Sequence, residues 1–292
     1  METIILIPDS FKGTLSSRQV CEAMERAVLR RKPRARVISI PVADGGEGTV
    51  EAFLTAMGGE RVECTVCGPH FAPMTAFYGL LPDGTAVIEM AACAGLPLAG
   101  KKKNPERTTT YGVGQLIMDA LDKGARKFLI GLGGSATNDC GMGMLEALGY
   151  KFYDTEGLEL SASGEAMCRV ARVDDTNLDA RLAKCEIVVA SDVDNVLSGK
   201  RGAAWVYAKQ KGATPTMIDA LDRGMCSFAE VVGGDYHNLP GAGAAGGVGY
   251  ALMALLGATL KPGIELVLDT LNFEEWHNRV GHSFWDEEVL PD

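Results

Sequence analysis

The amino-acid sequence predicts an α/β fold with a largely parallel sheet. Short apolar runs rich in branched residues recur along the chain, each too short to be a helix. Each run ends in a polar loop, and helical periodicity follows several of these loops. Strands that alternate with helices are typical of parallel sheets, whose right-handed crossovers place the strand carboxyl ends at one edge.

The first unit starts with a predicted strand over residues 3–8, which ends in a polar loop over residues 9–14. Ser16 and Gln19 have the spacing of a capping box, so we expect a helix to begin there. Pro33 ends that helix after a basic run, which we interpret as a solvated helix end.

The second unit repeats this order, with a strand over residues 36–42, a loop over 43–49 and a helix that ends near residue 58. Alternating segments over residues 63–90 then predict a small antiparallel meander, with a hairpin turn at 82–84. Helical periodicity returns at residues 113–122.

Two further strands complete the pattern. Residues 127–132 lead into the loop 133–139, and residues 185–190 lead into the loop 191–195. We therefore expect four polar loops to converge at one sheet edge, where open α/β sheets bind ligands.

Composition limits the class of protein. The 292 residues carry a net charge of −10 with a pI of about 5.0, which disfavours a nucleic-acid-binding surface. Apolar residues make up 47% of the chain, enough for a sizeable core, and glycine is abundant with 36 residues. Eight scattered cysteines contain one CxxC, Cys64 and Cys67, which we interpret as buried side chains in a reducing compartment rather than a zinc site.

No membrane segment or signal peptide is expected. The start of the chain lacks a basic, cleavable leader, and the uncharged stretch 238–260 is better interpreted as a buried helix than as a membrane span. The sequence thus predicts a cytoplasmic protein without a nucleic-acid or membrane partner.

The loops that follow the predicted strands supply the candidate site residues. Any single loop is better explained by a turn or a helix cap, but four converging loops favour a site. Their polar residues are Asp9, Ser10, Lys12, Asp44, Glu47, Ser135, Thr137, Asn138, Asp139, Asp192, Asp194 and Asn195.

The chemistry of this set indicates phosphoryl transfer. Clustered carboxylates suit Mg²⁺, glycine-rich loops present backbone N–H groups to phosphate, and a lysine neutralises phosphoryl charge. No histidine lies in these loops, which argues against a His-dependent triad or a zinc site. The acceptor would be a small hydroxylated molecule.

Known nucleotide motifs are weak here. No Walker-type P-loop occurs, and residues 241–246 match GxGxxG without the preceding apolar strand that a dinucleotide site requires. A glycine-rich loop that opens a helix at residues 248–256 and offers backbone to an anion is the better interpretation. A nicotinamide-dependent oxidoreductase stays as a weaker alternative.

Six motifs resemble the bacterial type I glycerate kinases. They are residues 8–14, 43–49, 133–141, 191–195, 210–215 and 241–247, in matching order from residue 3 to about residue 275. The resemblance implies a two-domain α/β kinase with ATP as donor, glycerate as acceptor and phosphoglycerate as product. A Rossmann-like domain and a mixed α/β domain would enclose the site.

By this resemblance, residues 1–60 and 240–292 form the discontinuous Rossmann-like domain, and residues 61–239 form the mixed α/β domain. Val196 stands where the family usually has proline. Family members also continue beyond the region of Pro262 with further α/β units, whereas residues 269–292 here hold seven acids and one basic residue. We therefore expect an incomplete Rossmann-like domain, from a premature end or a shifted reading frame.

The resemblance also assigns roles. Asp9, Lys12 and Asp192 are the expected catalytic residues, and Asp192 and Asp194 the expected magnesium ligands. Substrate and phosphate contacts are expected from Ser10, Asp44, Glu47, Ser135, Thr137, Asn138, Asp139, Asn195, Gly243 and Gly246. The alternative is a glycerate-binding protein that has lost transfer chemistry; self-association is left open in both cases.

Overall fold

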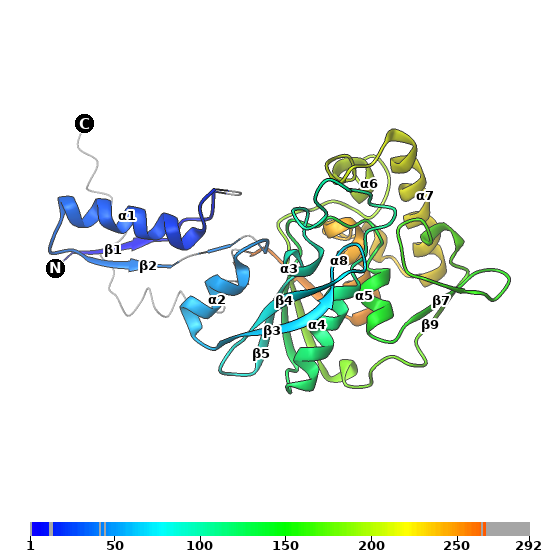
Figure 1. The fold of residues 1–292 in the computed structure, drawn as a ribbon, viewed down its shortest axis with the longest axis horizontal. Helices are drawn as coiled ribbons and strands as arrows, with labels where there is room; N and C mark the ends of the chain where they lie inside the picture. Colours follow the sequence, from blue (N-terminus) through cyan, green and yellow to red (C-terminus); the bar gives the residue numbers. More distant parts are fainter. Residues whose placement is uncertain (1, 12–13, 41, 44, 264, 267–292) are drawn as a thin grey trace.

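The computed structural model describes residues 2–11, 14–40, 42–43, 45–263 and 265–266. It is a mixed α/β protein with a parallel-rich central sheet, which confirms the predicted fold class. A small unit at the amino-terminal end of the chain extends from the main body (Figure 1).

That small unit is a two-stranded parallel sheet with one helix. Strand β1 (Thr3–Leu6) pairs with β2 (Arg36–Ser39), and helix α1 (Ser17–Arg31) connects them. The predicted capping box is confirmed: the Gln19 N–H donates to Ser16 Oγ at 3.2 Å, and the Ser16 N–H donates to Gln19 Oε1 at 2.8 Å. The Ser17 hydroxyl donates to the Pro8 carbonyl at 2.5 Å and fixes the end of β1 against the helix.

The central sheet has six strands in the order β11-β10-β6-β5-β4-β3. Its antiparallel half consists of β3 (Glu60–Cys67), β4 (Pro73–Leu80) and β5 (Thr85–Glu89), which confirms the predicted meander. Its parallel half continues from β5 through β6 (Lys127–Gly131) and β10 (Glu186–Ala190) to β11 (Thr259–Lys261). Gly84, with φ of +84°, closes the predicted hairpin turn.

The expectation of one sheet for all four predicted strands was wrong. Strands β1 and β2 pair only with each other, whereas β6 and β10 lie inside the six-stranded sheet. The edges of that sheet are formed by β3 and β11, and within the described residues neither of them pairs with β1 or β2. A third, antiparallel sheet was not predicted and contains β7 (Lys151–Tyr153), β8 (Glu159–Leu160) and β9 (Arg172–Asp174).

Successive side chains of a strand point to opposite faces of the sheet, and in β5, β6 and β10 most residues on both faces are buried, whereas several residues of the edge strand β3 are exposed. On β6, Phe128 and Ile130 join the large core, while Leu129 joins a smaller cluster under helix α2 (Thr49–Met57). The large core is covered by the remaining helices: α3 (Ala91–Ala94), α4 (Tyr111–Asp122), α5 (Met142–Ala147), α6 (Ala203–Tyr207), α7 (Pro215–Val232) and α8 (Ala244–Leu256). Short 3-10 turns η1 (Met167–Arg169), η2 (Leu182–Lys184), η3 (Lys209–Lys211) and η4 (Tyr236–Asn238) connect these elements.

Helix α8 confirms the buried helix that was predicted from the uncharged stretch. Ala245, Gly246 and Gly247 have left-handed backbone conformations, so the regular helix begins at Val248. None of the helices within the described residues is long and apolar enough to cross a membrane. Helix α8 and β11 pack with the six-stranded sheet, and the division into residues 1–60 with 240–292 and residues 61–239 stays a prediction.

Candidate functional site

Loops from four elements meet at the carboxyl edge of the parallel strands. Residues 133–139 follow β6, residues 191–195 follow β10 and residues 262–263 follow β11. The Gly263 N–H donates to Asp192 Oδ1 at 2.8 Å, which joins the last two loops. The predicted convergence of loops is therefore present for residues 133–139 and 191–195, whereas residues 262–263 were not among the predicted loops, and the sheet differs from the expected one.

The loop before α2 reaches the same edge from the other sheet. The Gly133 N–H donates to the Gly45 carbonyl at 2.9 Å. Gly45 has φ of +82°, and a Cβ there would lie 2.6 Å from the Ala190 carbonyl oxygen. Glycine is required at this position because both its backbone conformation and its close approach to β10 exclude a side chain.

The segment 133–138 is fixed from several sides. The Leu96 N–H donates to the Gly134 carbonyl at 2.8 Å, and the Ala136 N–H donates to the Ala94 carbonyl at 2.8 Å. The Thr108 hydroxyl donates to the Ala136 carbonyl at 2.9 Å. A loop held in this way positions its polar groups before any ligand arrives, which is what binding and catalytic sites need.

Lys211 is a functional candidate that the sequence analysis did not select. Its Nζ donates to Ser135 Oγ at 2.8 Å and to the Thr137 carbonyl oxygen at 2.7 Å, and only 2% of the residue is exposed. Burial lowers the pKa of the Lys211 ammonium to about 7, partly opposed by the charge of Asp139. The only sequence signal for Lys211 was its place in the motif 210–215. From sequence alone, a lysine there is indistinguishable from an ordinary solvated surface lysine.

Thr137 and Asn138 carry buried polar atoms without hydrogen-bond partners among the described residues. These atoms are Thr137 Oγ1 and both side-chain heteroatoms of Asn138, and both residues are 0% exposed. Such atoms are uncommon in folded proteins and usually bond to an ordered water or a ligand. These unpartnered side-chain atoms of Thr137 and Asn138 are therefore suited to the predicted contact with substrate or phosphate oxygens.

Asp139 has a different environment. Its carboxylate accepts hydrogen bonds from the Thr110 N–H and hydroxyl, both at 2.8 Å, and from the Gly141 and Gly143 N–H groups at 3.2 and 3.3 Å. Burial raises the pKa of Asp139, while these hydrogen bonds act in the opposite direction. The contacts give Asp139 a structural role at the start of α5, and its predicted ligand contact stays a prediction.

The glycine-rich segment before α8 connects two of the site loops. The Gly243 N–H donates to the Asn195 carbonyl at 2.8 Å, and the Cys140 N–H donates to the Gly246 carbonyl at 3.0 Å. The Asn195 side chain accepts from the Tyr207 hydroxyl at 2.7 Å and donates to the Arg201 carbonyl at 2.8 Å. Gly243, Gly246 and Asn195 thus contribute directly to the shape of the site edge.

The predicted metal ligands Asp192 and Asp194 lie on the loop after β10, and both are exposed. The side chain of Asp194 is 80% exposed and lies 3.8 Å from the Arg201 guanidinium. Within the described parts of the chain, no three His, Cys, Asp or Glu side chains are grouped closely enough to hold a metal. Two carboxylates still suit Mg²⁺, which commonly takes one or two protein carboxylates and completes its shell with water and phosphate oxygens.

The remaining predicted residues lie after β1 in the small unit, on the loop before α2, or outside the described residues. Asp9 is exposed, and its Oδ1 accepts from the Ser10 N–H at 2.6 Å, a local contact. Glu47 is exposed on the loop before α2. Lys12 and Asp44 lie outside the described residues.

Glu89 is a second residue that the sequence analysis missed. It ends β5, is buried, and accepts from the Gly48 N–H at 2.9 Å and the Val50 N–H at 3.3 Å, so it joins the sheet to the start of α2. Burial raises the pKa of the Glu89 carboxyl to about 7, with a smaller contribution from Glu47 in the same direction. In the sequence it looks like the last residue of a strand.

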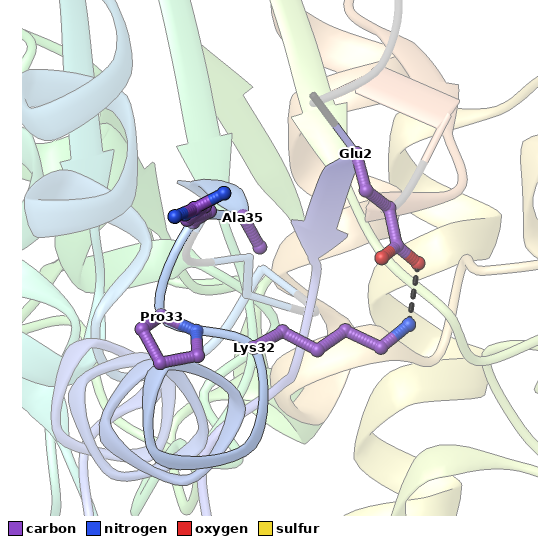
Figure 2. A pocket seen from close by; sticks show the side chains of 5 residues that line it. Glu2, Lys32, Pro33 and Ala35 are labelled. Carbon is purple, nitrogen blue, oxygen red and sulfur yellow. Dashed lines mark hydrogen bonds and ion pairs between the residues drawn. The ribbon is translucent and has the colours of Figure 1, made fainter.

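A separate pocket lies at the opposite end of the small unit. Its volume is about 400 Å³, and the ion pair between Glu2 and Lys32 in its lining measures 2.6 Å. Figure 2 shows this pair together with Pro33 and Ala35. It adjoins the amino ends of β1 and β2, away from the loops described above.

Comparison with known proteins identifies the family. The model of the glycerate kinase family matches residues 4–281. A glycerate kinase of Bacillus subtilis (strain 168) is 47% identical over 93% of this chain and 72% of its own length. A glycerate 2-kinase of Escherichia coli (strain K12) is also 47% identical, over 93% of this chain and 73% of its own.

A solved structure agrees with both sequence matches. The crystal structure of a candidate glycerate kinase 2 from Salmonella typhimurium LT2 superposes with a TM-score of 0.87 at 44% identity, covering 94% of this chain and 75% of that one. The resemblance found in the sequence motifs is thus confirmed across nearly all of the chain. The chain is an enzyme of the kinase class, and it belongs to the glycerate kinase family.

Proposed function

We propose that this chain phosphorylates glycerate, with ATP as the donor and Mg²⁺ as the assisting ion. The family and the names of its relatives support glycerate as the acceptor. The observation that carries the proposal is that the fixed loop 133–138 and the loop 191–195 with its carboxylates follow two neighbouring parallel strands, β6 and β10. Backbone N–H groups, hydroxyls and carboxylates brought to one edge are what phosphoryl transfer requires.

In the reaction, a glycerate hydroxyl attacks the γ-phosphorus, ADP leaves, and the hydroxyl proton passes to a carboxylate. Asp192 and Asp194 would hold Mg²⁺, which neutralises phosphate charge when it is bound. Asp192 is also the candidate that orients or deprotonates the hydroxyl, because the Gly263 N–H already fixes one of its oxygens. Asp9 and Lys12 would interact with the charge of the substrate or the phosphoryl group.

The binding groups are assigned to the fixed loops. Ser135, Thr137 and Asn138 would contact anionic oxygens, and Asn195, Gly243 and Gly246 would shape the same edge. Ser10, Asp44, Glu47 and Asp139 complete the predicted set of binding residues.

The test is release of ADP from ATP and Mg²⁺, measured with and without D-glycerate. We expect glycerate-dependent release, and a loss of about 10²–10⁴-fold in kcat for Asp192→Asn, the usual contribution of a group that takes up the proton. The matched control is Asp219→Asn, which changes an exposed carboxylate on α7 and should leave the rate unchanged.

Two outcomes would contradict the proposal. A wild-type chain that gains thermal stability from glycerate without releasing ADP would favour the alternative, a glycerate-binding protein without transfer chemistry. Full activity of Asp192→Asn would remove Asp192 from the reaction.

A further inference from the structure

Lys211 is a buried cation whose direct partners are neutral. Its ammonium contacts one hydroxyl oxygen and one carbonyl oxygen, those of Ser135 and Thr137. Buried charges in proteins are normally paired with an opposite charge, because desolvation of an isolated charge is costly. No carboxylate among the described residues forms an ion pair or a hydrogen bond with this ammonium.

None of the charged or titratable groups described around Lys211 pairs directly with its ammonium as an opposite charge. Asp139 acts on it only at longer range, and its carboxylate already accepts four hydrogen bonds. The thiol of Cys140 is fully buried, and burial raises its pKa far above the usual range, so it stays neutral. Lys209 on the same turn and Lys103, whose backbone faces Gly212, are further cations.

Ser135 connects this cation to the site edge. Because its oxygen accepts from Lys211 Nζ, its own O–H is available to donate to another acceptor. A hydroxyl that accepts from an ammonium is polarised and becomes a stronger donor. The unpartnered polar atoms of Thr137 and Asn138 lie on the same loop, so the loop carries several donors and a buried positive charge.

We propose that Lys211 is a positioning residue for the transfer reaction: it fixes Ser135 and Thr137, and its charge makes the loop 133–138 a subsite for an anionic oxygen. The inference rests on the proposed function. The ligand chemistry is a carboxylate or phosphate oxygen, which glycerate and ATP can each supply. Measuring KM for both substrates distinguishes the two sources.

The variant Lys211→Met removes the ammonium and keeps an unbranched side chain. We expect KM to rise about 10- to 100-fold for the substrate whose anion the loop binds, as for loss of a charge-assisted hydrogen bond. Lys209→Met, an exposed lysine on the same turn, is the matched control and should match the wild type. Ser135→Ala should raise KM for the same substrate. In the double variant that combines Lys211→Met with Ser135→Ala, KM should rise by less than the product of the two single increases.

A pH profile separates this role from a merely structural one. With the pKa of Lys211 near 7 in the free enzyme, the ammonium is lost as pH rises from 6 to 9. The ratio of wild-type kcat/KM to that of Lys211→Met should therefore fall across this range. A ratio that is constant with pH, or an unchanged KM in Lys211→Met, overturns the inference and leaves the proposed function intact.

The inference stays testable if the main measurement fails. If Lys211→Met does not fold, KM is measured for Ser135→Ala instead. A raised KM supports the subsite, and an unchanged KM overturns it. If the wild type shows no turnover, the proposed function fails, and the Tm shift produced by D-glycerate or ADP replaces KM. A shift that Lys211→Met loses supports the subsite; an equal shift in both proteins, or none in the wild type, overturns it.

Discussion

Glu89 shows how one buried carboxylate joins two layers of the molecule. It stands at the end of β5, yet its oxygens accept from backbone N–H groups at the start of α2, where the helix dipole favours negative charge. Desolvation outweighs these favourable contacts, so the pKa of Glu89 is raised to about 7. The group therefore changes its charge close to neutral pH.

The variant Glu89→Gln should remove a pH-dependent part of the stability. Between the ordinary pKa of 4.5 and the folded value near 7, the folded chain holds a proton that the unfolded chain has released. This contribution to stability is therefore complete below pH 4.5 and is lost as pH rises through 7. From pH 5 to 8 the wild type should lose about 1–3 kcal/mol relative to Glu89→Gln, measured by urea unfolding. Parallel pH curves for the two proteins would contradict this.

At single positions, sequence patterns predicted which polar residues lie at the carboxyl ends of strands, but not how deeply each one is buried. Ser135 and Asp192 were selected because each follows a strand in a polar loop, and both lie at the expected edge. Lys211 and Glu89 were missed because burial and the loss of solvent are created by distant parts of the chain. Asp139 was selected as a ligand residue, whereas its contacts are internal, since a sequence does not show which donors meet a carboxylate.

The segment that opens α8 is the element with the most constrained backbone. Three successive residues, from Ala245 to Gly247, are left-handed, a conformation that glycine adopts without steric cost and alanine does not. A Cβ on Gly246 would lie 2.2 Å from the Thr137 carbonyl oxygen. The segment therefore depends on glycine for its conformation and also for its contact with the site loop.

The variants Gly246→Ala and Gly257→Ala separate these two requirements. Gly257 also has a positive φ, but a Cβ there would meet no atom within 4 Å, so only the backbone cost applies, about 1 kcal/mol. Gly246→Ala adds a steric clash and should cost about 3 kcal/mol or more. Urea unfolding measures both, and equal losses would show that contact with Thr137 adds nothing.

Whole elements were predicted more accurately than their pairing. Strand β6 was expected at residues 127–132 and spans Lys127–Gly131, and the hairpin before β5 was confirmed. Hydrophobic patterns mark a strand but do not name its partner, so β1 and β2 were assigned to the wrong sheet. The strands β7 to β9 were missed because two or three residues are too few for a periodicity.

At the scale of the whole molecule, the small unit is less deeply buried than the main body and has a smaller sheet. The strands β5, β6 and β10 of the six-stranded sheet are buried on both faces, whereas β1 and β2 form a two-stranded sheet with most residues only partly buried. Two-stranded sheets are marginal without further packing. Figure 1 shows this unit joined to the body near the loop before α2.

We expect local opening to be easiest in the small unit. Hydrogen exchange followed by mass spectrometry should show amides of β1 and β2 exchanging at least about tenfold faster than those of β5 and β6, because exchange follows local stability. Peptides from β3, an edge strand of the main body, serve as the internal comparison. Equal protection of β1 and β6 would show that the two parts open together.

The strand order of the central sheet also governs how the chain assembles on the ribosome. Thr259 of β11 pairs with Val188 of β10, so about 70 further residues must be synthesised after β10 before its outer neighbour can pair with it. At typical synthesis rates of about 5–20 residues per second, this takes roughly 4–14 s. During that interval the backbone of β10 is an exposed strand edge, the kind of surface that chaperones and neighbouring chains recognise. This edge of β10 therefore stays open to wrong partners until residues 259–261 have been made and have paired with it.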